Sequence, residues 1–492
     1  MRRKKGSTLQ ARKGLPGGAY RPLTEEDIAQ IHATSMKVFE EVGIQINSER
    51  ALSLFKDAGA SVETENRIVK MPGQKVMEII ENTPHVVKLY GRNSEHHLEI
   101  GGNRVHMGTG GTALYIIDAH NGERRPAVLE DLKNIARLVQ ALENIHFFML
   151  PVYPQDVPPK DVDVNRFLTA LNFSEKHVMG GVYTLEGIRN VIKMGEIIAG
   201  SKQAFRQKPF ISMVTCPISP FKLDQGYSEL TMEIARAGIP VVTPAEPLCG
   251  ATAPVTLAGN LVVQNVDTIA GILLTQLVNP GTPVLYGCIS SITDLRDMKY
   301  LSGAIEMGLM NAAAAQMAQF YRLPYYATAG MSDAKTNDAQ AGYESALTGL
   351  MVALSGANYI HDAAGFLEFC LSASYEKYVI DNEIIGMIMR AVEGIKVNEE
   401  TLAFDLIKKI GPGGHFVSAK HTRRYMRKEH YTPQLSNRDT REVWEEAGKK
   451  ETRERAREQV QAILSQPEHT FIPDNVRHQL REEIPGLDPR IL

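Results

Sequence analysis

Eight short apolar segments alternate with helices or loops along residues 102–379 of this 492-residue chain. Each segment is rich in β-branched and aromatic residues and nearly free of charge, which is typical of strands buried on both faces of a parallel sheet. Eight β/α units over roughly 260 residues predict a (β/α)8 barrel, also called a TIM barrel. The expected strands are Val105–Gly108 or Ala113–Ile117, then Ile145–Pro151, His177–Tyr183, Pro209–Thr215, Ile239–Pro244, Thr282–Ser290, Leu323–Thr328 and Ala357–His361.

A doubly wound open sheet is the competing architecture. In its dinucleotide-binding form, a Gly-rich turn follows the first strand and an acidic residue stands about 20 positions further on. This sequence lacks that combination. The closed barrel is therefore the expected fold.

The segments outside the barrel predict three further parts. Residues 1–23 are rich in Gly, Lys and Arg and predict a flexible basic arm. Residues 24–101 predict an N-terminal α/β cap of helices and small strands, with Thr24 capping the first helix. Residues 380–492 predict a C-terminal helical extension. The helices expected there and late in the barrel include Tyr300–Phe320, Tyr343–Leu354, Asp381–Val392 and a long charged helix, Arg438–Leu464.

The overall charge and the apolar segments exclude several classes of protein. A net charge of −3 argues against a general nucleic-acid-binding protein. The longest apolar stretch, Leu257–Val278, is interrupted by polar residues, so no membrane span is expected. A secretory signal has an apolar region after its basic start. No such region follows the basic residues Met1–Lys5, so a secretory signal is not expected. Four cysteines without a CxxC pair predict free thiols and a cytoplasmic location.

In a barrel of this type, ligands bind at the loops that follow the strands. These positions carry few charges and several aromatic or small polar residues. Glu246 stands between Pro244 and Pro247, so a rigid turn fixes the direction of its carboxylate. The candidate substrate-binding residues are Gly110, Gly111, Tyr153, Tyr183, Thr215, Glu246, Gln340, His361 and Phe366.

Structural roles compete with several of these assignments. His361 ends an apolar strand and fits a core histidine as well as a ligand contact. Gly108–Gly111 fits a tight turn as well as a set of backbone N–H groups for an anion. Four aromatic residues could offer π-faces, but aromatic residues at such spacing often belong to the core. They are Phe366, Phe369, Tyr375 and Tyr378.

The sequence gives little support for a metal centre. No histidine pair and carboxylate stand at the spacing of a zinc site, so no metal is expected. Three cysteines near strand ends could bind a soft metal with His361, but small buried hydrophobic residues are the simpler interpretation. The cysteines concerned are Cys216, Cys249 and Cys288.

Four longer motifs carry a resemblance to a known family. They are GMSDAKTNDAQAGYE (Gly330–Glu344), the segment Gly356–Phe369, YVIDNEI (Tyr378–Ile384) and GPGGHF (Gly411–Phe416). With the N-terminal helices and the helical tail, the chain resembles the trimethylamine methyltransferase family over roughly residues 24–490. This resemblance implies a (β/α)8 barrel that transfers a methyl group from an amine nitrogen to the Co(I) corrinoid of a separate protein.

The resemblance also implies a branch of the family. The archaeal trimethylamine enzymes carry pyrrolysine, whereas this sequence contains the twenty standard residues alone. It is similar to the non-pyrrolysine branch, whose members demethylate quaternary amines such as glycine betaine. The expected partners are a small quaternary amine and a cognate corrinoid (cobalamin) protein, and a homo-oligomer is expected. His361, Thr215 or the Gly110 and Gly111 backbone would hold a betaine carboxylate, and Glu246 would offset the cation.

Two other functions remain compatible with the residues alone. A barrel without turnover would only bind a quaternary amine or the corrinoid protein. A metal-dependent lyase on the same fold would require stoichiometric metal after purification.

Overall fold

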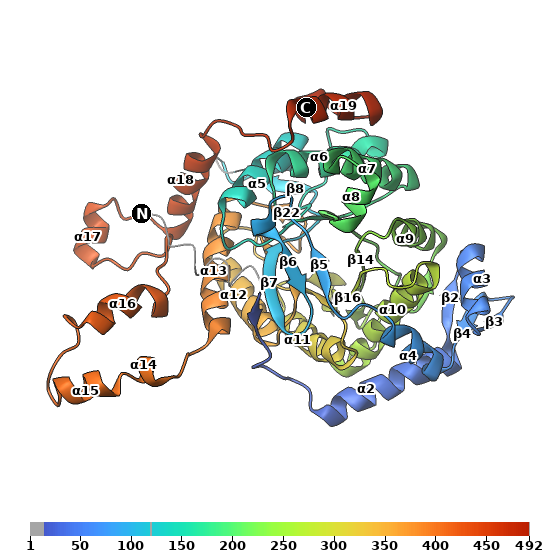
Figure 1. Ribbon diagram of the computed structural model, residues 1–492, viewed down its shortest axis with the longest axis horizontal. Coiled ribbons are helices and arrows are strands. Elements are labelled where there is room, and N and C mark those ends of the chain that lie inside the picture. The colour runs from blue at the N-terminus through green and yellow to red at the C-terminus, as the bar shows by residue number, and fades with distance from the viewer. Residues whose placement is uncertain (1–13, 119–120, 492) are drawn as a thin grey trace.

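The structure, a computed structural model, describes residues 14–118 and 121–491. At its centre, eight parallel strands form a ring surrounded by helices (Figure 1). The ring closes where the His146 amide donates to the Met107 carbonyl at 2.8 Å and the Thr109 hydroxyl donates to the Met149 carbonyl at 2.7 Å. The predicted (β/α)8 barrel is therefore confirmed. In chain order, its strands are β7 (Arg104–Thr109), β10 (Phe148–Met149), β11 (Val178–Gly181), β12 (Ile211–Val214), β14 (Val241–Ala245), β16 (Val284–Cys288), β19 (Tyr325–Thr328) and β20 (Tyr359–Ala364).

All eight barrel strands lie at the predicted segments. Of the two candidates for the first strand, the earlier one forms β7. The later one contains β8 (Tyr115–Ile117), which belongs to a small sheet beside the barrel. The other strands of this sheet are β9 (Arg124–Pro126), β21 (Phe366–Leu367) and β22 (Ser372–Ala373).

The outer helices begin and end at the capping residues that the sequence provides. The Thr184 hydroxyl accepts from the Gly187 amide at 2.9 Å, and Gly200 ends the same helix with a positive φ of 82°. Asp224 and Gly238 play the same two roles for the helix that follows β12. The helices around the barrel are α5 (Leu129–Ala141), α6 (Val162–Phe173), α7 (Leu185–Ala199), α8 (Lys202–Gln207), α9 (Gln225–Ala237), α10 (Leu257–Val278), α11 (Ile305–Phe320), α12 (Ala339–Leu354) and α13 (Tyr375–Glu393).

Helix α10 is apolar because protein covers it on every side. Among the described residues, it is the one helix long and apolar enough to cross a membrane, and 83% of its most apolar window is buried in the protein. Its polar side chains form hydrogen bonds within the protein. The Asn265 side chain, for example, is hydrogen-bonded to the hydroxyls of Tyr286, Tyr321 and Ser35. These contacts identify α10 as a core helix of the barrel.

The barrel interior is filled by stacked aromatic rings. Phe147 stacks on Tyr359 at a centroid distance of 3.5 Å, Tyr359 on Tyr326 at 5.6 Å, and Tyr326 on His361 at 4.1 Å. The hairpin of β5 (Val87–Leu89) and β6 (Leu98–Ile100) packs its apolar residues into the same cluster. The interior is therefore a packed core with polar chemistry at one end.

The N-terminal cap packs on the outside of the barrel. Thr24 forms the predicted capping box with Asp27 at the start of α2 (Glu25–Lys37). Residues 1–13 of the predicted flexible arm lie outside the described residues, but residues 14–23 lie against the barrel, where β1 (Leu15–Pro16) pairs with β7. The other elements of the cap are β2 (Ile44–Ile46), α3 (Glu49–Asp57), β3 (Ser61–Glu63), β4 (Ile68–Lys70) and α4 (Gly73–Glu81).

Three predicted helix starts in the barrel are wrong. The expected helix from Tyr300 begins at Ile305, because Tyr300 belongs to β18 (Lys299–Leu301), which pairs with β17 (Ser291–Asp294) as a hairpin. Helix α12 begins four residues early because Asp338 caps it by accepting from the Ala341 amide. Helix α13 begins at Tyr375 and spans the boundary placed at residue 380.

The C-terminal extension is more broken than its charge pattern predicts. The single helix expected over Arg438–Leu464 is two helices, α17 (Arg441–Glu446) and α18 (Thr452–Leu464), because Gly448 and Lys449 adopt positive φ. Helix α18 packs on α13 and α5, and α19 (Asp474–Glu483) packs on α7. We use "projecting arm" for residues 394–430, which contain α14 (Glu399–Leu402), α15 (Phe404–Ile410) and α16 (Lys420–Glu429).

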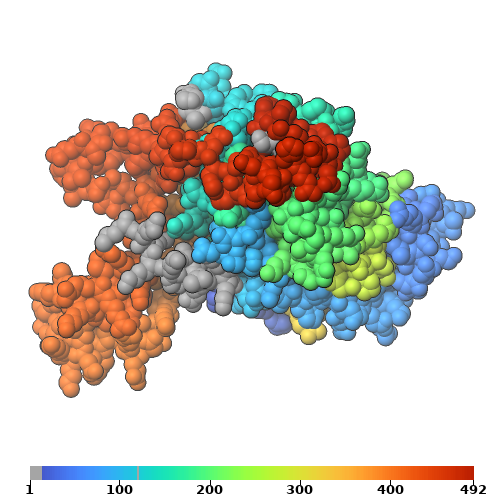
Figure 2. Space-filling model, turned by 45° about the horizontal axis from the view of Figure 1, so that its top comes forward, coloured from blue at the N-terminus to red at the C-terminus, as the bar shows by residue number. Residues whose placement is uncertain are grey.

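The projecting arm leaves the body of the molecule and returns to it (Figure 2). None of its described residues is buried, and Phe404 and Val417 are among its exposed apolar side chains. Its base is tied to α13, because Arg390 donates to the Glu429 carbonyl at 3.0 Å. Just beyond it, the Glu383 carboxylate accepts from the Leu435 amide at 2.6 Å. The arm is thus anchored at its base and bare along its length.

Candidate functional site

A cavity of about 790 Å³ opens at the carboxyl-terminal end of the barrel strands. Its floor includes Met149 and Tyr326, which also belong to the packed interior. The residues on its wall that carry chemistry come from different strand ends and loops. They are Gly111, Thr112, Gly181, Tyr183, Thr215, Cys216, Asp224, Glu246, Lys299, Tyr300, His361, Asp362, Phe369 and Cys370.

An irregularity in β20 brings two neighbouring polar residues to this cavity. Ile360 pairs with Met107 of β7, but the next paired residue, Ala364, lies opposite Thr109. Three residues of β20 therefore stand opposite one residue of β7, and Asp362 adopts a positive φ of 61°. Because of this bulge, adjacent side chains that would normally point to opposite faces reach the same site.

His361 and Asp362 form a hydrogen-bonded pair. The His361 Nδ1 atom lies 2.7 Å from the Ala327 carbonyl, which can only accept, so Nδ1 carries a hydrogen. Its Nε2 atom lies 2.9 Å from Asp362 Oδ2, which also accepts from the Thr328 hydroxyl at 2.8 Å. The two side chains are thus held together by this contact and by their hydrogen bonds to Ala327 and Thr328.

Glu246 lines the cavity and forms no ion pair among the described residues. It faces the cavity, and burial by the surrounding protein, together with the charge of Asp362, raises the pKa of its carboxyl to about 7, with His361 acting in the opposite direction. Asp224 also lines the cavity, but its carboxylate caps α9 by accepting from the Tyr227 amide at 2.7 Å. A cation that entered the cavity would find its counter-charge at Glu246.

A left-handed turn directly after β21 forms part of the cavity wall. Glu368, Phe369 and Cys370 have consecutive positive φ values of 52°, 59° and 65°, a conformation that L-residues rarely adopt. The turn is held by two backbone hydrogen bonds of 3.0 Å, from Glu368 to Ala334 and from Leu371 to Glu368. Strain of this kind persists where the surrounding structure enforces it. Here it brings Phe369 and Cys370 to the cavity.

Aromatic rings line much of the remaining wall. Tyr300 reaches the cavity from the β17–β18 hairpin, and burial raises the pKa of its hydroxyl well above the ordinary value. Tyr183 is 48% exposed and packs edge-on against Tyr153 at 5.6 Å. The face of Phe369 is contacted by the Lys335 ammonium at 4.2 Å. The Arg166 guanidinium lies 5.7 Å from the Tyr183 ring. Tyr300 and Tyr326, whose hydroxyl pKa values the charge of Glu246 helps to raise, are thus the rings beside Glu246 that a cation could use.

The cysteines do not form a reactive or metal-binding cluster. Cys216 is exposed to the cavity, but desolvation by the surrounding protein and the charge of Glu246 raise the pKa of its thiol to about 12, so the thiolate that acts as nucleophile or ligand is disfavoured. Cys249 and Cys288 are buried. Over residues 14–118 and 121–491, no group of three or more His, Cys, Asp or Glu side chains could hold a metal ion.

The structure brings together five of the nine predicted site residues. Gly111, Tyr183, Thr215, Glu246 and His361 line the cavity. The Thr215 hydroxyl bonds to Thr231 at 2.9 Å. Gly110 and Tyr153 support the wall from behind, through Asp362 and Tyr183 respectively.

Two predicted residues lie elsewhere. Phe366 is fully buried in the main core, because β21 turns its ring inward and the left-handed turn presents Phe369 to the cavity instead. Gln340 belongs to the first turn of α12 and donates to Glu344 at 2.9 Å. Both are corrections that follow from local backbone geometry.

Sequence reasoning missed Thr112, Lys299, Tyr300 and Tyr326. Tyr326 could have been found by strand alternation, since Tyr325 and Tyr326 must point to opposite faces. Tyr300 was expected at the start of a helix, so the sequence did not indicate that a hairpin brings it to the cavity. Thr112 lies between the two candidates for the first strand, so its place relative to the strand end was not defined.

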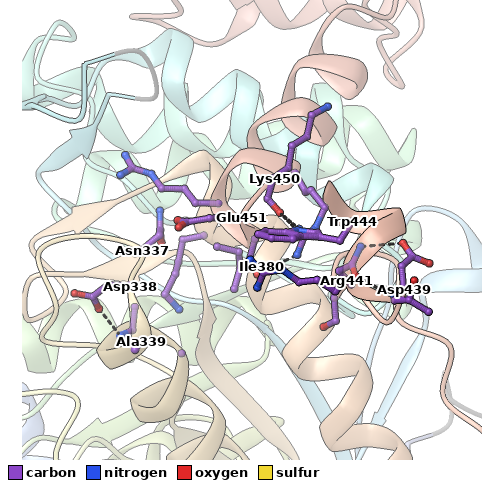
Figure 3. A pocket seen from close by; sticks show the side chains of 18 residues that line it. Asn337, Asp338, Ala339, Ile380, Asp439, Arg441, Trp444, Lys450 and Glu451 are labelled. Carbon is purple, nitrogen blue, oxygen red and sulfur yellow. Dashed lines mark hydrogen bonds between the residues drawn. The ribbon is translucent and has the colours of Figure 1, made fainter. Parts of the chain in front are cut away.

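A larger cavity of about 840 Å³ lies outside the barrel, between α12, α13 and the C-terminal segments (Figure 3). Trp444 and Arg441 line it, with the guanidinium 5.3 Å from the indole ring. The Trp444 Nε1–H donates to the Lys450 carbonyl at 3.1 Å, and Arg441 also pairs with Glu445. Lys377, Arg441 and Lys450 of this cavity each pair with a carboxylate of the protein. The barrel cavity, at the carboxyl-terminal end of the strands, is the better candidate site.

Comparison with known proteins places the chain in a family. The family model "Trimethylamine methyltransferase (MTTB)" matches residues 2–485. This chain is a member of the trimethylamine methyltransferase family. The predicted resemblance is therefore confirmed.

The curated relatives include proteins with two different substrates in their names. A trimethylamine methyltransferase of Desulfitobacterium hafniense strain DCB-2 is 37% identical over 459 residues, 93% of this chain and 92% of the relative. A glycine betaine methyltransferase of D. hafniense strain Y51 is 35% identical over 475 residues, 96% and 95% of the two chains. Among solved structures, the Methanosarcina barkeri monomethylamine methyltransferase is similar, with a TM-score of 0.46, 13% identity, and coverage of 92% and 96%.

The contact between Gly110 and Asp362 gives a test of the site geometry. A Cβ atom at position 110 would lie 1.5 Å from Asp362 Oδ1, so Gly110→Ala must displace the carboxylate or the loop. We expect a loss of about 1–3 kcal/mol in the free energy of unfolding, as for overpacked sites.

Chemical denaturation measures this loss. Gly342→Ala is the matched control, because a Cβ at Gly342 meets no atom within 4 Å. Equal stability of the two variants would contradict the described contact.

Proposed function

We propose that this protein transfers a methyl group from a quaternary amine, most directly glycine betaine, to the Co(I) corrinoid of a separate corrinoid protein, with release of a dimethylated amine. The observation that carries the proposal is the barrel cavity, where Glu246 forms no ion pair among the described residues and stands near the rings of Tyr300 and Tyr326. The glycine betaine methyltransferase relative, at 35% identity, supports the choice of substrate.

The chemistry fits a site without an acid catalyst. A quaternary ammonium already carries the charge that activates its methyl carbon toward displacement. When the C–N bond breaks, its electron pair stays on nitrogen and a neutral tertiary amine leaves, so no proton has to be supplied. The role of the protein is to bind the cation, exclude water and aim one methyl group at the acceptor. The disfavoured Cys216 thiolate agrees with a protein that supplies no nucleophile of its own.

The acceptor would approach from the open end of the cavity. Lys299 and Tyr300 stand on the β17–β18 hairpin, and Phe369 stands on the left-handed turn. Co(I) supplies the nucleophile when the corrinoid protein is docked. The corrinoid enters as the methyl acceptor, so no metal ligand from this chain is required.

Turnover tests the proposal directly. The purified protein, incubated with Co(I) cobalamin and a panel of glycine betaine, proline betaine, carnitine and trimethylamine, should methylate cobalt with a quaternary amine. Cobalamin absorbance and the dimethylated product should change in equal amounts.

Binding without any cobalt methylation would instead favour a barrel that has lost turnover. Neither binding nor methylation with any member of the panel would refute the proposal.

The pKa of Glu246 predicts a pH dependence of binding. Because this pKa is raised to about 7, the carboxyl is neutral below pH 7 and charged above it. Affinity for a quaternary amine should therefore weaken as the pH falls from 8 to 6, roughly tenfold for a group that titrates across this range. Isothermal titration calorimetry measures it. Glu246→Gln should bind weakly at both pH values, and an unchanged pH dependence in that variant would remove Glu246 from the cation site.

We also propose a cytoplasmic location and a homo-oligomer. The four cysteines are free, which fits a reducing compartment. Between residues 395 and 430, eight Lys and Arg against four Asp and Glu give a formal charge of +4, which leaves −7 for the rest of a chain of −3. The bare apolar side chains of the projecting arm, such as Phe404, would be covered by the acidic body of a second copy.

Analytical ultracentrifugation tests the oligomer. Phe404→Glu should shift the protein to a smaller species with its helical content unchanged. The exposed body residue Leu295 gives the control, Leu295→Glu. An unchanged sedimentation coefficient for Phe404→Glu would exclude the arm from the interface.

A further inference from the structure

A buried arginine stands directly behind one wall of the barrel cavity. Arg166 on α6 is 0% exposed. Its guanidinium donates to neutral oxygens, at distances between 3.0 and 3.4 Å. The acceptors are the carbonyls of Leu150, Val152 and Gly181 and the hydroxyls of Thr112 and Tyr183.

The positive charge of Arg166 has no ion-pair partner among the described residues. The nearest acidic group that it influences is Asp163, which lies one turn earlier on α6. The Asp163 carboxylate is used by the Tyr183 and Thr184 amides, with distances of 3.1 and 3.3 Å from Oδ2. Burial raises the pKa of Asp163, with Arg166 acting in the opposite direction. A buried guanidinium bound mainly to neutral groups leaves positive potential at the wall in front of it.

Two hydroxyl groups connect Arg166 to the cavity surface. Thr112 and Tyr183 both line the cavity, and both accept a hydrogen bond from Arg166. A hydroxyl that accepts from arginine keeps its own hydrogen and can donate it outward. Its donation is strengthened when the acceptor is charged. This wall is therefore suited to an anionic group.

The anion wall and the cation wall lie apart on the barrel ring. Arg166 bonds to groups that follow β7, β10 and β11, whereas Glu246 follows β14, which is three strands from β10 around the ring. Lys299 also lines the cavity, but it is exposed on its hairpin and already pairs with Asp297. The cavity therefore has a positive wall and a negative wall that face a single ligand.

We propose that Arg166, acting through the hydroxyls of Thr112 and Tyr183, positions the carboxylate of the betaine substrate. The ammonium of the substrate lies toward Glu246, and its carboxylate accepts from the two hydroxyls in front of Arg166. This assignment rests on the proposed function and deepens it, because it names the side chains that make the cavity prefer an amine with a carboxylate. It also replaces His361, Thr215 and the Gly110–Gly111 backbone as the expected carboxylate donors. Arg166 is a positioning residue, since it acts through the two hydroxyls.

The assignment also sets the orientation of the transferred methyl. With the carboxylate fixed on one wall, the trimethylammonium group is placed above Tyr326 and beside Glu246. An amine without a carboxylate would keep the ammonium contacts but lose this fixed direction. Its methyl groups would then be aimed less well even where its affinity is adequate.

Calorimetry with two probes tests the assignment. Glycine betaine and choline share a trimethylammonium group, but choline has a neutral hydroxyl in place of the carboxylate. The native protein should bind glycine betaine at least tenfold more tightly than choline. The double variant Thr112→Val/Tyr183→Phe, which removes both hydroxyls with little change in volume, should abolish most of this preference by weakening glycine betaine alone. Tyr343→Phe, on an exposed face of α12, is the matched control.

The outcomes separate this inference from the proposed function. Equal affinity of the native protein for both probes, or equal weakening of both in the double variant, overturns the carboxylate assignment. If choline then still methylates Co(I) cobalamin, the proposed function stands without it. If neither probe binds and no quaternary amine turns over, both fail.

Discussion

The close approach of Asp362 to Gly110 fixes the place where the last barrel strand meets the first. An aspartate oxygen occupies the space that any Cβ at position 110 would need. The bulge in β20 and the positive φ of Asp362 create this approach, and they also turn His361 into hydrogen-bonding distance of its neighbour. The resulting pair contributes shape and hydrogen bonds to the cavity, while Glu246 forms no ion pair among the described residues. The arrangement of polar groups on this side of the cavity follows from that one contact.

The distribution of charge around the cavity then explains how a small ligand can be held in one direction. A carboxylate near an ammonium stabilises the ground state, and it would slow transfer if it lay too close to the nitrogen. Here Tyr300 and Tyr326 line the cavity with Glu246, while Arg166 bonds from behind another part of the wall to the hydroxyls of Thr112 and Tyr183. Neither wall needs to be protonated or deprotonated during methyl transfer. The site is therefore suited to position a substrate and to act on it through a fixed electrostatic field, which is what the displacement of a neutral amine requires.

The barrel could be predicted from the sequence because eight strands buried on both faces leave a strong periodic signal. Glu246 could be found as well, since its flanking prolines limit where its side chain points. The details that depend on departures from regular backbone could not. Phe366 and Phe369 exchange roles through three consecutive left-handed residues, and Tyr300 reaches the cavity from a hairpin whose residues continue a helical pattern. The role of Arg166 could not be predicted from the sequence. Every residue of α6 is buried, so nothing in the pattern distinguishes the arginine that stands behind the cavity.

Recognition of positive charge by Glu246 and the rings beside it is the central claim, and a pair of isosteres measures it most directly. Glycine betaine and 3,3-dimethylbutanoate have the same shape and the same carboxylate, but carbon replaces the charged nitrogen in the second. Calorimetric titration at pH 8 should show the carbon isostere, which lacks the positive charge, binding at least tenfold more weakly, and Glu246→Gln should reduce this difference. Equal affinity of the native protein for the two compounds would contradict the account, because the cavity would then recognise shape alone.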